Sequence, residues 1–363
     1  MGGRACVLVL VSACSYSPGA GTAPADSAEP DDTAPDMQVN ANCFGQFGTV
    51  CLAGLPTQEL AIGNTESTIV TDVLANCEAI TNDSNVNGCV VSGTSVTIDG
   101  TLIGTGGKPL ILIATDGPLI VQRLLDVSSH GEVRGAGANP TGACTGATIA
   151  EGAAGGAGGS LGGTGGGGGA GVGGAATTAA PGGVPASLRG GCPGRLGGTP
   201  MSSTAGGSGG GAIWLISNER IVINGVVNAS GAGGQGGPGD PLANHGGAGG
   251  GSGGMIVLDA PIVEISATGV VMATGGGGGG GNASAFSGLD GDDPDPMNPD
   301  DPADGGTGVG GDSGGDGGTT GNGGNGDSEA GSTGCGGGGG TGYIRGFGTL
   351  MIEGAAFPVI STN

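Results

Sequence analysis

Positive charge and aromatic side chains are scarce in this sequence. Its 363 residues include 8 Lys and Arg against 31 Asp and Glu, a net charge of −23, and the aromatic residues are five Phe, two Tyr and one Trp. Nucleic-acid binding is excluded, because a polyanion needs a cationic surface. The sequence also has no apolar run long enough to cross a bilayer and no GxxxxGK[ST] phosphate loop.

Glycine is abundant instead. The chain has 95 glycines, more than a quarter of its residues, whereas average usage is about 7%. The glycines follow no strict three-residue period and there are only 20 prolines, which excludes a collagen triple helix. Because glycine has no side chain to bury, a hydrophobic core has to come from the segments between the glycine runs.

The N-terminal residues predict export. Arg4 precedes a short apolar run, and small residues come directly before Cys14. This pattern predicts a signal peptide over residues 1–13. Residues 14–41 are rich in Ala, Pro and Asp, so we expect a disordered acidic tether there.

The sequence Val-Ser-Ala before Cys14 resembles the lipobox of bacterial lipoproteins. The resemblance implies that Cys14 is the lipidated residue and that the membrane is a partner through this anchor. Ser15 stands where Asp would retain a lipoprotein in the inner membrane, which implies the outer membrane or cell surface. An ordinary secretory signal is the alternative.

Seven cysteines lie beyond Cys6 and Cys14. An exported chain meets an oxidising compartment, which favours disulfides, and no CxxC pair suggests a zinc site. The sequence does not determine connectivity. The economical local pairs are Cys43 with Cys51 and Cys77 with Cys89, followed by Cys144 with Cys192. Cys335, set in a polyglycine run, is the candidate unpaired thiol, and the alternative is that it displaces one of the others.

Internal repeats give the strongest structural signal. The stretch containing Val96 aligns without a gap on those containing Leu119 and Ile221, and a later unit near Ile262 matches after a small slip. Each unit alternates aliphatic and polar residues, as strands do. A unit of about two dozen residues that stacks on its neighbours predicts an all-β parallel β-helix, or solenoid. An antiparallel sandwich is the alternative.

The predicted organisation therefore has a cysteine-containing N-terminal cap at residues 42–93 and a β-helix at residues 94–363. Long glycine-rich loops are inserted between the coils at about residues 130–211, 231–254 and 275–340. Such segments either stay mobile or pack as polyglycine-II-like helices, and the sequence leaves both open.

The phrases at residues 109–114, 228–234 and 249–258 resemble those of glycine-rich, adhesin-like surface lipoproteins with β-helix cores in Gram-negative bacteria. A weaker likeness is to the PGRS class of glycine-rich surface proteins. The resemblance implies a non-enzymatic structural or adhesin-like role at the cell surface. It also implies an envelope or extracellular polysaccharide or protein as partner.

An enzyme is the first alternative, because many β-helix proteins are polysaccharide lyases or hydrolases. Acids of the predicted strands are scattered over different repeat positions, whereas a hydrolase needs closely placed carboxylates. Asp99, Gln122 and Asn224 share one repeat position and predict a polar ladder. His130 and His245 lie outside any known catalytic pattern, so we expect exposed loop residues and no catalytic activity.

A weak calcium-binding surface module is the second alternative. Hard oxygen ligands at close spacing on a flexible chain suit Ca²⁺, but the EF-hand pattern is absent, and a solvated acidic loop explains the run equally well. The candidate calcium ligands are Asp290, Asp292, Asp293, Asp295, Asp300, Asp301 and Asp304.

Overall fold

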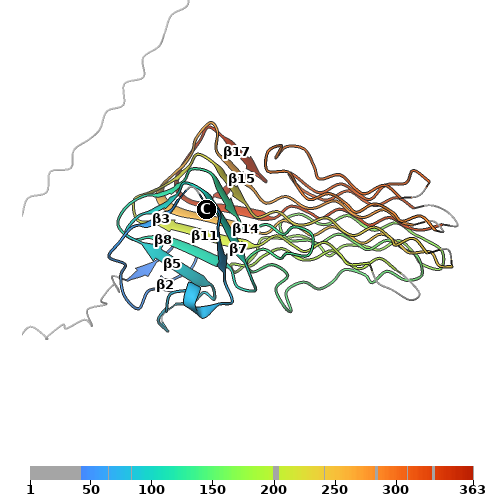
Figure 1. Ribbon diagram of the computed structural model, residues 1–363, viewed down its shortest axis with the longest axis horizontal. Helices are drawn as coiled ribbons and strands as arrows, with labels where there is room; N and C mark the ends of the chain where they lie inside the picture. The colour runs from blue at the N-terminus through green and yellow to red at the C-terminus, as the bar shows by residue number, and fades with distance from the viewer. Residues whose placement is uncertain are drawn as a thin grey trace, which may run out of the picture. The chain divides into compact units, whose positions relative to one another are not determined.

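Nearly all strands of the protein run parallel to their neighbours (Figure 1). The computed structural model describes residues 42–362 except 64, 83, 199–203, 241, 283, 284, 309 and 329–331. The predicted signal peptide, Cys14 and the tether lie outside the described residues. The helical content of the described part is one short 3-10 turn, η1 (Leu74–Asn76), so no described helix could span a bilayer.

The strands form two wide sheets and one small antiparallel pair, β1 (Cys43–Phe44) with β2 (Val50–Cys51). The six-stranded sheet has the order β17 (Ala355–Phe357), β15 (Val270–Met272), β13 (Val226–Asn228), β10 (Leu124–Asp126), β7 (Thr101–Thr105), β4 (Ser67–Val70). The ten-stranded sheet has the order β3 (Leu60–Ile62), β6 (Val96–Ile98), β9 (Leu119–Val121), β12 (Arg220–Ile223), β14 (Met255–Ile265), β11 (Ala212–Ser217), β8 (Leu110–Ala114), β5 (Cys89–Gly93), with β16 (Tyr343–Ile352) beside β14 and β18 (Ser361–Thr362) beside β16.

The repeat alignment predicted which residues pair. Val96 of β6 lies opposite Leu119 of β9, which in turn lies opposite Ile221 of β12. All three side chains are fully buried, as the alternating pattern requires when one face of a sheet meets the core. The predicted polar ladder is present in part, because Asn224 Nδ2 donates to Gln122 Oε1 at 3.1 Å.

Strands β8, β11 and the first half of β14 are buried on both faces, which explains their continuous aliphatic runs. One face joins the main core between the sheets. The other, with Ile111, Trp214 and Val257, packs against Phe44 and Val50 of the N-terminal segment. The Oδ2 atom of Asp259 also accepts the backbone N–H of Gln46 at 2.5 Å, which ties this segment to β14.

The prediction of a parallel β-helix with loops between its coils is wrong, although the protein is all-β. Strand β14 pairs with β11 through its first residues and with β12 after an irregularity between Asp259 and Ile262. Two rows of strands that would form separate faces of a β-helix are therefore one ten-stranded sheet. The parallel strands form a nearly closed, barrel-like arrangement. Alternation in the sequence specifies which face of a strand is buried, but not where one sheet ends and the next begins.

The glycine-rich segments, where the structure describes them, are joined to one another by backbone hydrogen bonds. They leave the same end of the sheets and run side by side away from them (Figure 1). Their backbone hydrogen bonds recur every third residue: Gly155 N donates to Gly169 O and Gly158 N to Gly166 O, both at 2.8 Å. A three-residue period without ladder strands is the geometry of polyproline-II-type helices, here joined to their neighbours by hydrogen bonds. We call this part the glycine bundle.

The segment 246–254 lies at the centre of the glycine bundle. Each of its nine amides donates to a carbonyl of a neighbouring segment at 2.7–3.0 Å, reaching residues 192–198, 229–235 and 334–340 in turn. Its carbonyls accept hydrogen bonds from three further segments, at residues 156–159, 207–210 and 276–279. Six neighbours around one helix leave room for few side chains, which is why seven of its nine residues are glycine and the other two are the small Ala248 and Ser252.

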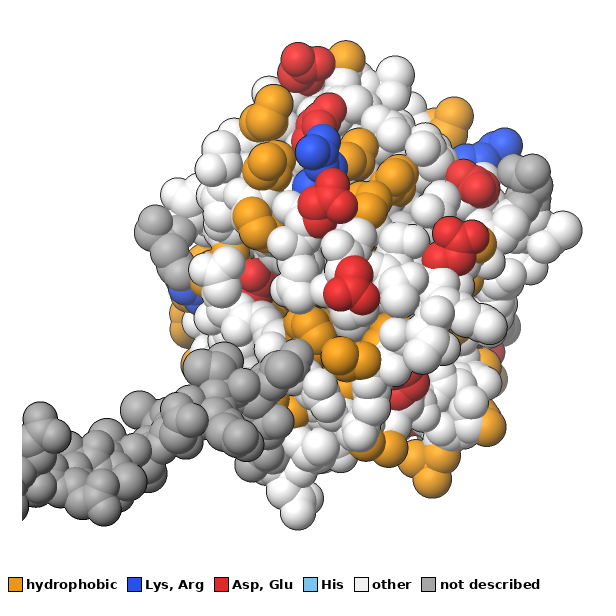
Figure 2. Space-filling view, turned by 90° about the vertical axis from the view of Figure 1, so that its left-hand side faces the viewer, with side chains coloured by type: hydrophobic (Ala, Val, Ile, Leu, Met, Phe, Trp, Pro, Cys, Tyr) orange, Lys and Arg blue, Asp and Glu red, His pale blue; other side chains and the backbone are white. Residues whose placement is uncertain are grey.

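The end of the molecule that the strands form is seen in Figure 2. Hydrophobic side chains on this face are scattered among acidic groups and do not gather into a single patch. Exposed hydrophobic residues scattered singly are normal on a protein surface. This face therefore gives no indication of a large apolar docking site.

Candidate functional sites

Among the described residues, three disulfides are present, and they join the predicted pairs of consecutive cysteines: Cys43 with Cys51, Cys77 with Cys89, and Cys144 with Cys192. The first joins β1 to β2, and the second joins Cys77 to Cys89, the first residue of β5. The third closes a stretch of the glycine bundle with a sequence separation of 48. Cys335 is buried, and its Sγ accepts a hydrogen bond from Gly281 N at 3.3 Å.

Two short ladders of side-chain acceptors line the edges of the glycine bundle. Asn322, Asn325 and Ser328 accept hydrogen bonds from the amides of Thr164, Gly167 and Ala170 at 2.7–3.0 Å. In the second ladder, Asp293, Asp290 and Ser287 accept from Gly233, Gly236 and Gly239 at 2.7–2.8 Å. In both ladders the donor amides are spaced by three residues. At these edges of the bundle, polar side chains take the place of backbone carbonyls as acceptors for the amides.

The candidate calcium ligands separate into two groups. Asp290, Asp292 and Asp293 line one hollow of about 550 Å³, together with Glu132 and Arg134. The other four candidates do not line this hollow: Asp295 Oδ1 accepts Met297 N, Asp301 Oδ2 accepts Asn298 Nδ2, Asp304 O accepts Asp292 N, and Asp300 is exposed. Among the described residues, no group of three or more His, Cys, Asp or Glu is arranged to hold a metal ion.

A serine, a histidine and two aspartates meet where β10 leaves the sheet. His130 Nε2 lies 2.7 Å from Ser128 Oγ and 3.3 Å from Asp126 Oδ2, and its Nδ1 lies 3.4 Å from Asp293 Oδ2. Sequence reasoning missed this cluster, because Asp293 comes from a distant glycine-rich segment. The residue types are those of a catalytic triad of nucleophile, base and acid. Whether His130 could act as a base therefore depends on its protonation state.

Hydrogen bonds to Asp126 and Asp293 raise the pKa of His130 to about 10, against the opposing effect of partial burial. Burial raises the pKa of Asp126, but hydrogen bonds from His130 and Ser128 outweigh it, so the net shift is downward. At neutral pH the cluster is therefore an imidazolium between two carboxylates. Ser128 Oγ donates to Asp126 Oδ1 at 2.5 Å and is buried. A protonated imidazole cannot accept the serine proton. Because His130 contacts both Asp126 of β10 and Asp293 of the glycine bundle, the cluster joins the sheet to the bundle.

His245 differs from its predicted exposure. Its side chain is 2% exposed, and Nε2 lies 3.4 Å from Asp240 Oδ2. The backbone N–H of His245 donates to Asn282 Oδ1 at 2.6 Å, while Thr333 Oγ1 donates to Asn282 O. His245 therefore packs where three glycine-rich segments meet.

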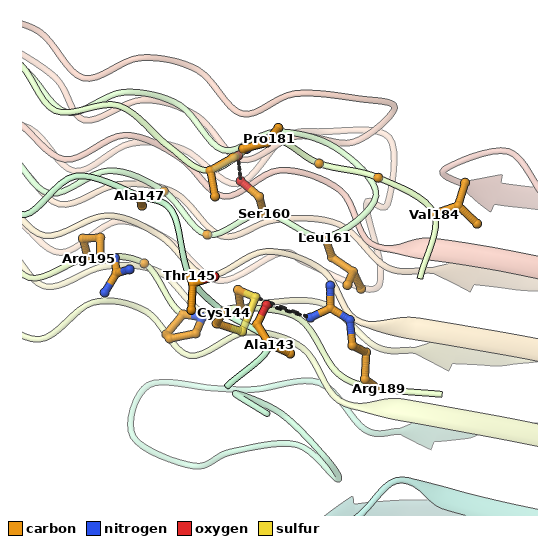
Figure 3. Close-up of a pocket in the computed structure, with 18 residues that line it drawn as sticks. Ala143, Cys144, Thr145, Ala147, Ser160, Leu161, Pro181, Val184, Arg189 and Arg195 are labelled. Carbon is orange, nitrogen blue, oxygen red and sulfur yellow. Dashed lines mark hydrogen bonds between the residues drawn. A yellow bond between two sulfur atoms is a disulfide. The ribbon is translucent and has the colours of Figure 1, made fainter. Parts of the chain in front are cut away.

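A pocket of about 250 Å³ lies in the glycine bundle near the sheets (Figure 3). Arg189 and Arg195 line it, and the disulfide of Cys144 and Cys192 lies between their guanidinium groups in this view. Both arginines are half-buried, and burial lowers the pKa of Arg189. Ser160 Oγ donates to Ala180 O at 2.6 Å and holds the opposite wall. Sequence reasoning also missed this pocket, although the three-residue spacing of Arg189, Cys192 and Arg195 is visible in the sequence.

Comparison of the chain with models of known protein families, with curated proteins and with solved structures finds no match.

Proposed function

We propose that this protein is a non-enzymatic structural or adhesin-like protein of the cell surface, lipid-anchored through Cys14. The observation that carries the proposal is the glycine bundle, in which segment 246–254 is hydrogen-bonded to six neighbours. About half of the chain serves to build this element. Its amides and carbonyls are largely used within the bundle, which suits a rigid projecting part rather than a catalytic loop.

The disulfides support export. Three cross-links in one chain are typical of an oxidising compartment and are rare in the cytosol. They agree with a signal peptide at residues 1–13 and with placement at the outer membrane or cell surface. An envelope or extracellular polysaccharide or protein is the proposed class of partner.

The protonation of His130 supports a role without catalysis. This residue is the histidine closest to a serine hydroxyl, at 2.7 Å from Ser128 Oγ, and its pKa of about 10 keeps it cationic at neutral pH. A general base has to be unprotonated at the working pH. The carbohydrate-active alternative therefore gains no support from this cluster.

The anchor is tested by expressing the full chain in a Gram-negative host beside Cys14→Ala and Cys6→Ala variants. We expect the wild type and Cys6→Ala to carry the mass of an acylated cysteine and to fractionate with membranes, because Cys6 is removed with the signal peptide. Cys14→Ala should lose both properties. An unmodified, unanchored wild type would refute the proposed anchoring.

A further inference from the structure

The pocket that Arg189 and Arg195 line concentrates positive charge in a molecule that has little of it. The chain has 8 Lys and Arg residues and a net charge of −23, yet two of the arginines line this one pocket of about 250 Å³. Arg220, which lies outside the pocket, is paired with Glu219 at 3.3 Å. Over the described ranges, neither pocket arginine lies within ion-pair distance of a carboxylate.

We infer that this pocket is a binding site for a small oxyanion, either a free carboxylate or sulfate or the same group on an acidic saccharide. A guanidinium group carries five N–H donors in a planar fork that matches such oxyanions. The protein contacts of Arg189 Nη1 are long, 3.5 Å to Ala143 O and 3.8 Å to Cys192 Sγ. Most of its donor capacity is therefore open to a ligand.

The backbone places both arginines toward one side of their segment. Gly191 N donates to Gly210 O and Gly194 N to Gly207 O, so the segment has the three-residue period of the bundle. Arg189, Cys192 and Arg195 are spaced by three and so occupy one face, two turns from end to end. The two cations thus border a common pocket without any tertiary rearrangement.

The pocket is also preformed. The disulfide from Cys144 to Cys192, with Cα atoms 5.3 Å apart, fixes its rim to the segment that carries the arginines. Ser160, whose Oγ also accepts Gly165 N at 2.8 Å, fixes the facing wall. A rigid site loses little conformational entropy when a ligand binds. Partial burial of Arg189 weakens competition from water for the guanidinium group.

The test is calorimetric titration of the full chain at low ionic strength with acetate, sulfate, glucuronate and, as a neutral sugar, glucose. We expect at least one anion to bind with a dissociation constant in the millimolar range or below, and to bind more weakly as salt is added. Glucose should not bind. Equal affinity for acetate and glucuronate supports a site for a free carboxylate, and tighter binding of glucuronate supports an acidic saccharide.

Arg189→Gln and Arg195→Gln should each weaken anion binding about tenfold, since each removes charge-assisted hydrogen bonds. Arg123→Gln is the matched control, because Arg123 is exposed and lies outside the pocket. Unchanged melting temperatures verify folding. Absence of anion binding by the wild type, or equal effects of all three substitutions, would overturn the inference. The site does not depend on lipidation, so the Cys14→Ala experiment tests the proposed function separately.

Discussion

The backbone of Gly158 approaches that of Gly338 so closely that a side chain cannot fit between them. A Cβ atom on Gly158 would lie 1.9 Å from Gly338 O, far inside van der Waals contact. Gly158 N meanwhile donates to Gly166 O on another neighbouring segment. Many glycines of the bundle meet a carbonyl in this way, so the composition follows from the distance between segments.

Gly158→Ala should destabilise the glycine bundle by about 1–3 kcal/mol, because the added methyl group forces two backbones apart. Gly321→Ala is the matched control: it makes the same change in the same bundle, but its Cβ would have no atom within 4 Å. Thermal unfolding followed by circular dichroism measures both variants. Equal melting temperatures for the two variants would contradict the close packing.

His130 predicts how stability depends on pH. Its pKa is raised from 6.5 to about 10 in the folded protein, so its ion pairs stabilise fully below pH 6.5 and are lost as the pH rises through 10. His130→Gln should therefore reduce the loss of stability between pH 6.5 and pH 10. The effect is at most on the order of 1 kcal/mol, because the side chain is 48% exposed and the ion pairs are screened.

The measurement is the melting temperature of both proteins at pH 6 and pH 10. Asp126 shifts the other way: its pKa is lowered, so its contribution is present above its ordinary value of 3.8 and is lost only as the pH falls below that value. Identical alkaline destabilisation of the wild type and His130→Gln would show that these ion pairs do not stabilise the fold.

Among the three disulfides of the described residues, the one from Cys144 to Cys192 closes the longest loop, with a sequence separation of 48 against 8 for Cys43 and Cys51. It therefore restricts the conformational entropy of the unfolded chain most. Replacing both members of the longer pair by Ser should lower the free energy of unfolding by about 2–4 kcal/mol. Replacing the shorter pair should cost about 1.5 kcal/mol less. Chemical denaturation measures both, and the reverse order would contradict this account.

The second ladder, formed by Asp293, Asp290 and Ser287, predicts a difference between two substitutions of Asp290. Asp290→Ala should speed hydrogen exchange at the Gly236 amide about threefold to tenfold, because it removes the acceptor at 2.8 Å. Asp290→Asn keeps an acceptor oxygen and should leave the rate close to that of the wild type. If Asp290 instead binds calcium, added Ca²⁺ should slow exchange in the wild type, and Asp290→Asn should abolish that effect.

The sequence predicts the strands of this molecule well and their assembly less well. Alternating aliphatics place Val96, Leu119 and Ile221 in one buried row, since period and burial are local properties. Strand β14 pairs first with β11 and then with β12, and no local feature of the sequence predicts that one strand spans both. The predicted division of the strands into β-helix faces was therefore wrong.

The glycine bundle could be predicted only as one of two possibilities. Its segments are nearly identical in composition, and a shift by three residues gives the same pattern, so their partners cannot be chosen from sequence. For the same reason, contacts between distant segments of the bundle, such as that between His130 and Asp293, cannot be predicted from the sequence. The cysteine pairs were accessible because short separations favour closure.

For the molecule as a whole, the central claim is that its glycine-rich half is ordered by backbone hydrogen bonds. Hydrogen exchange followed by NMR on protein labelled with ¹⁵N-glycine tests it directly. Glycine amides of segment 246–254 should exchange as slowly as those of a buried strand, while exposed Gly54 exchanges fast. Exchange of that segment at the rate of Gly54 would show that the glycine-rich half is mobile and would contradict the account.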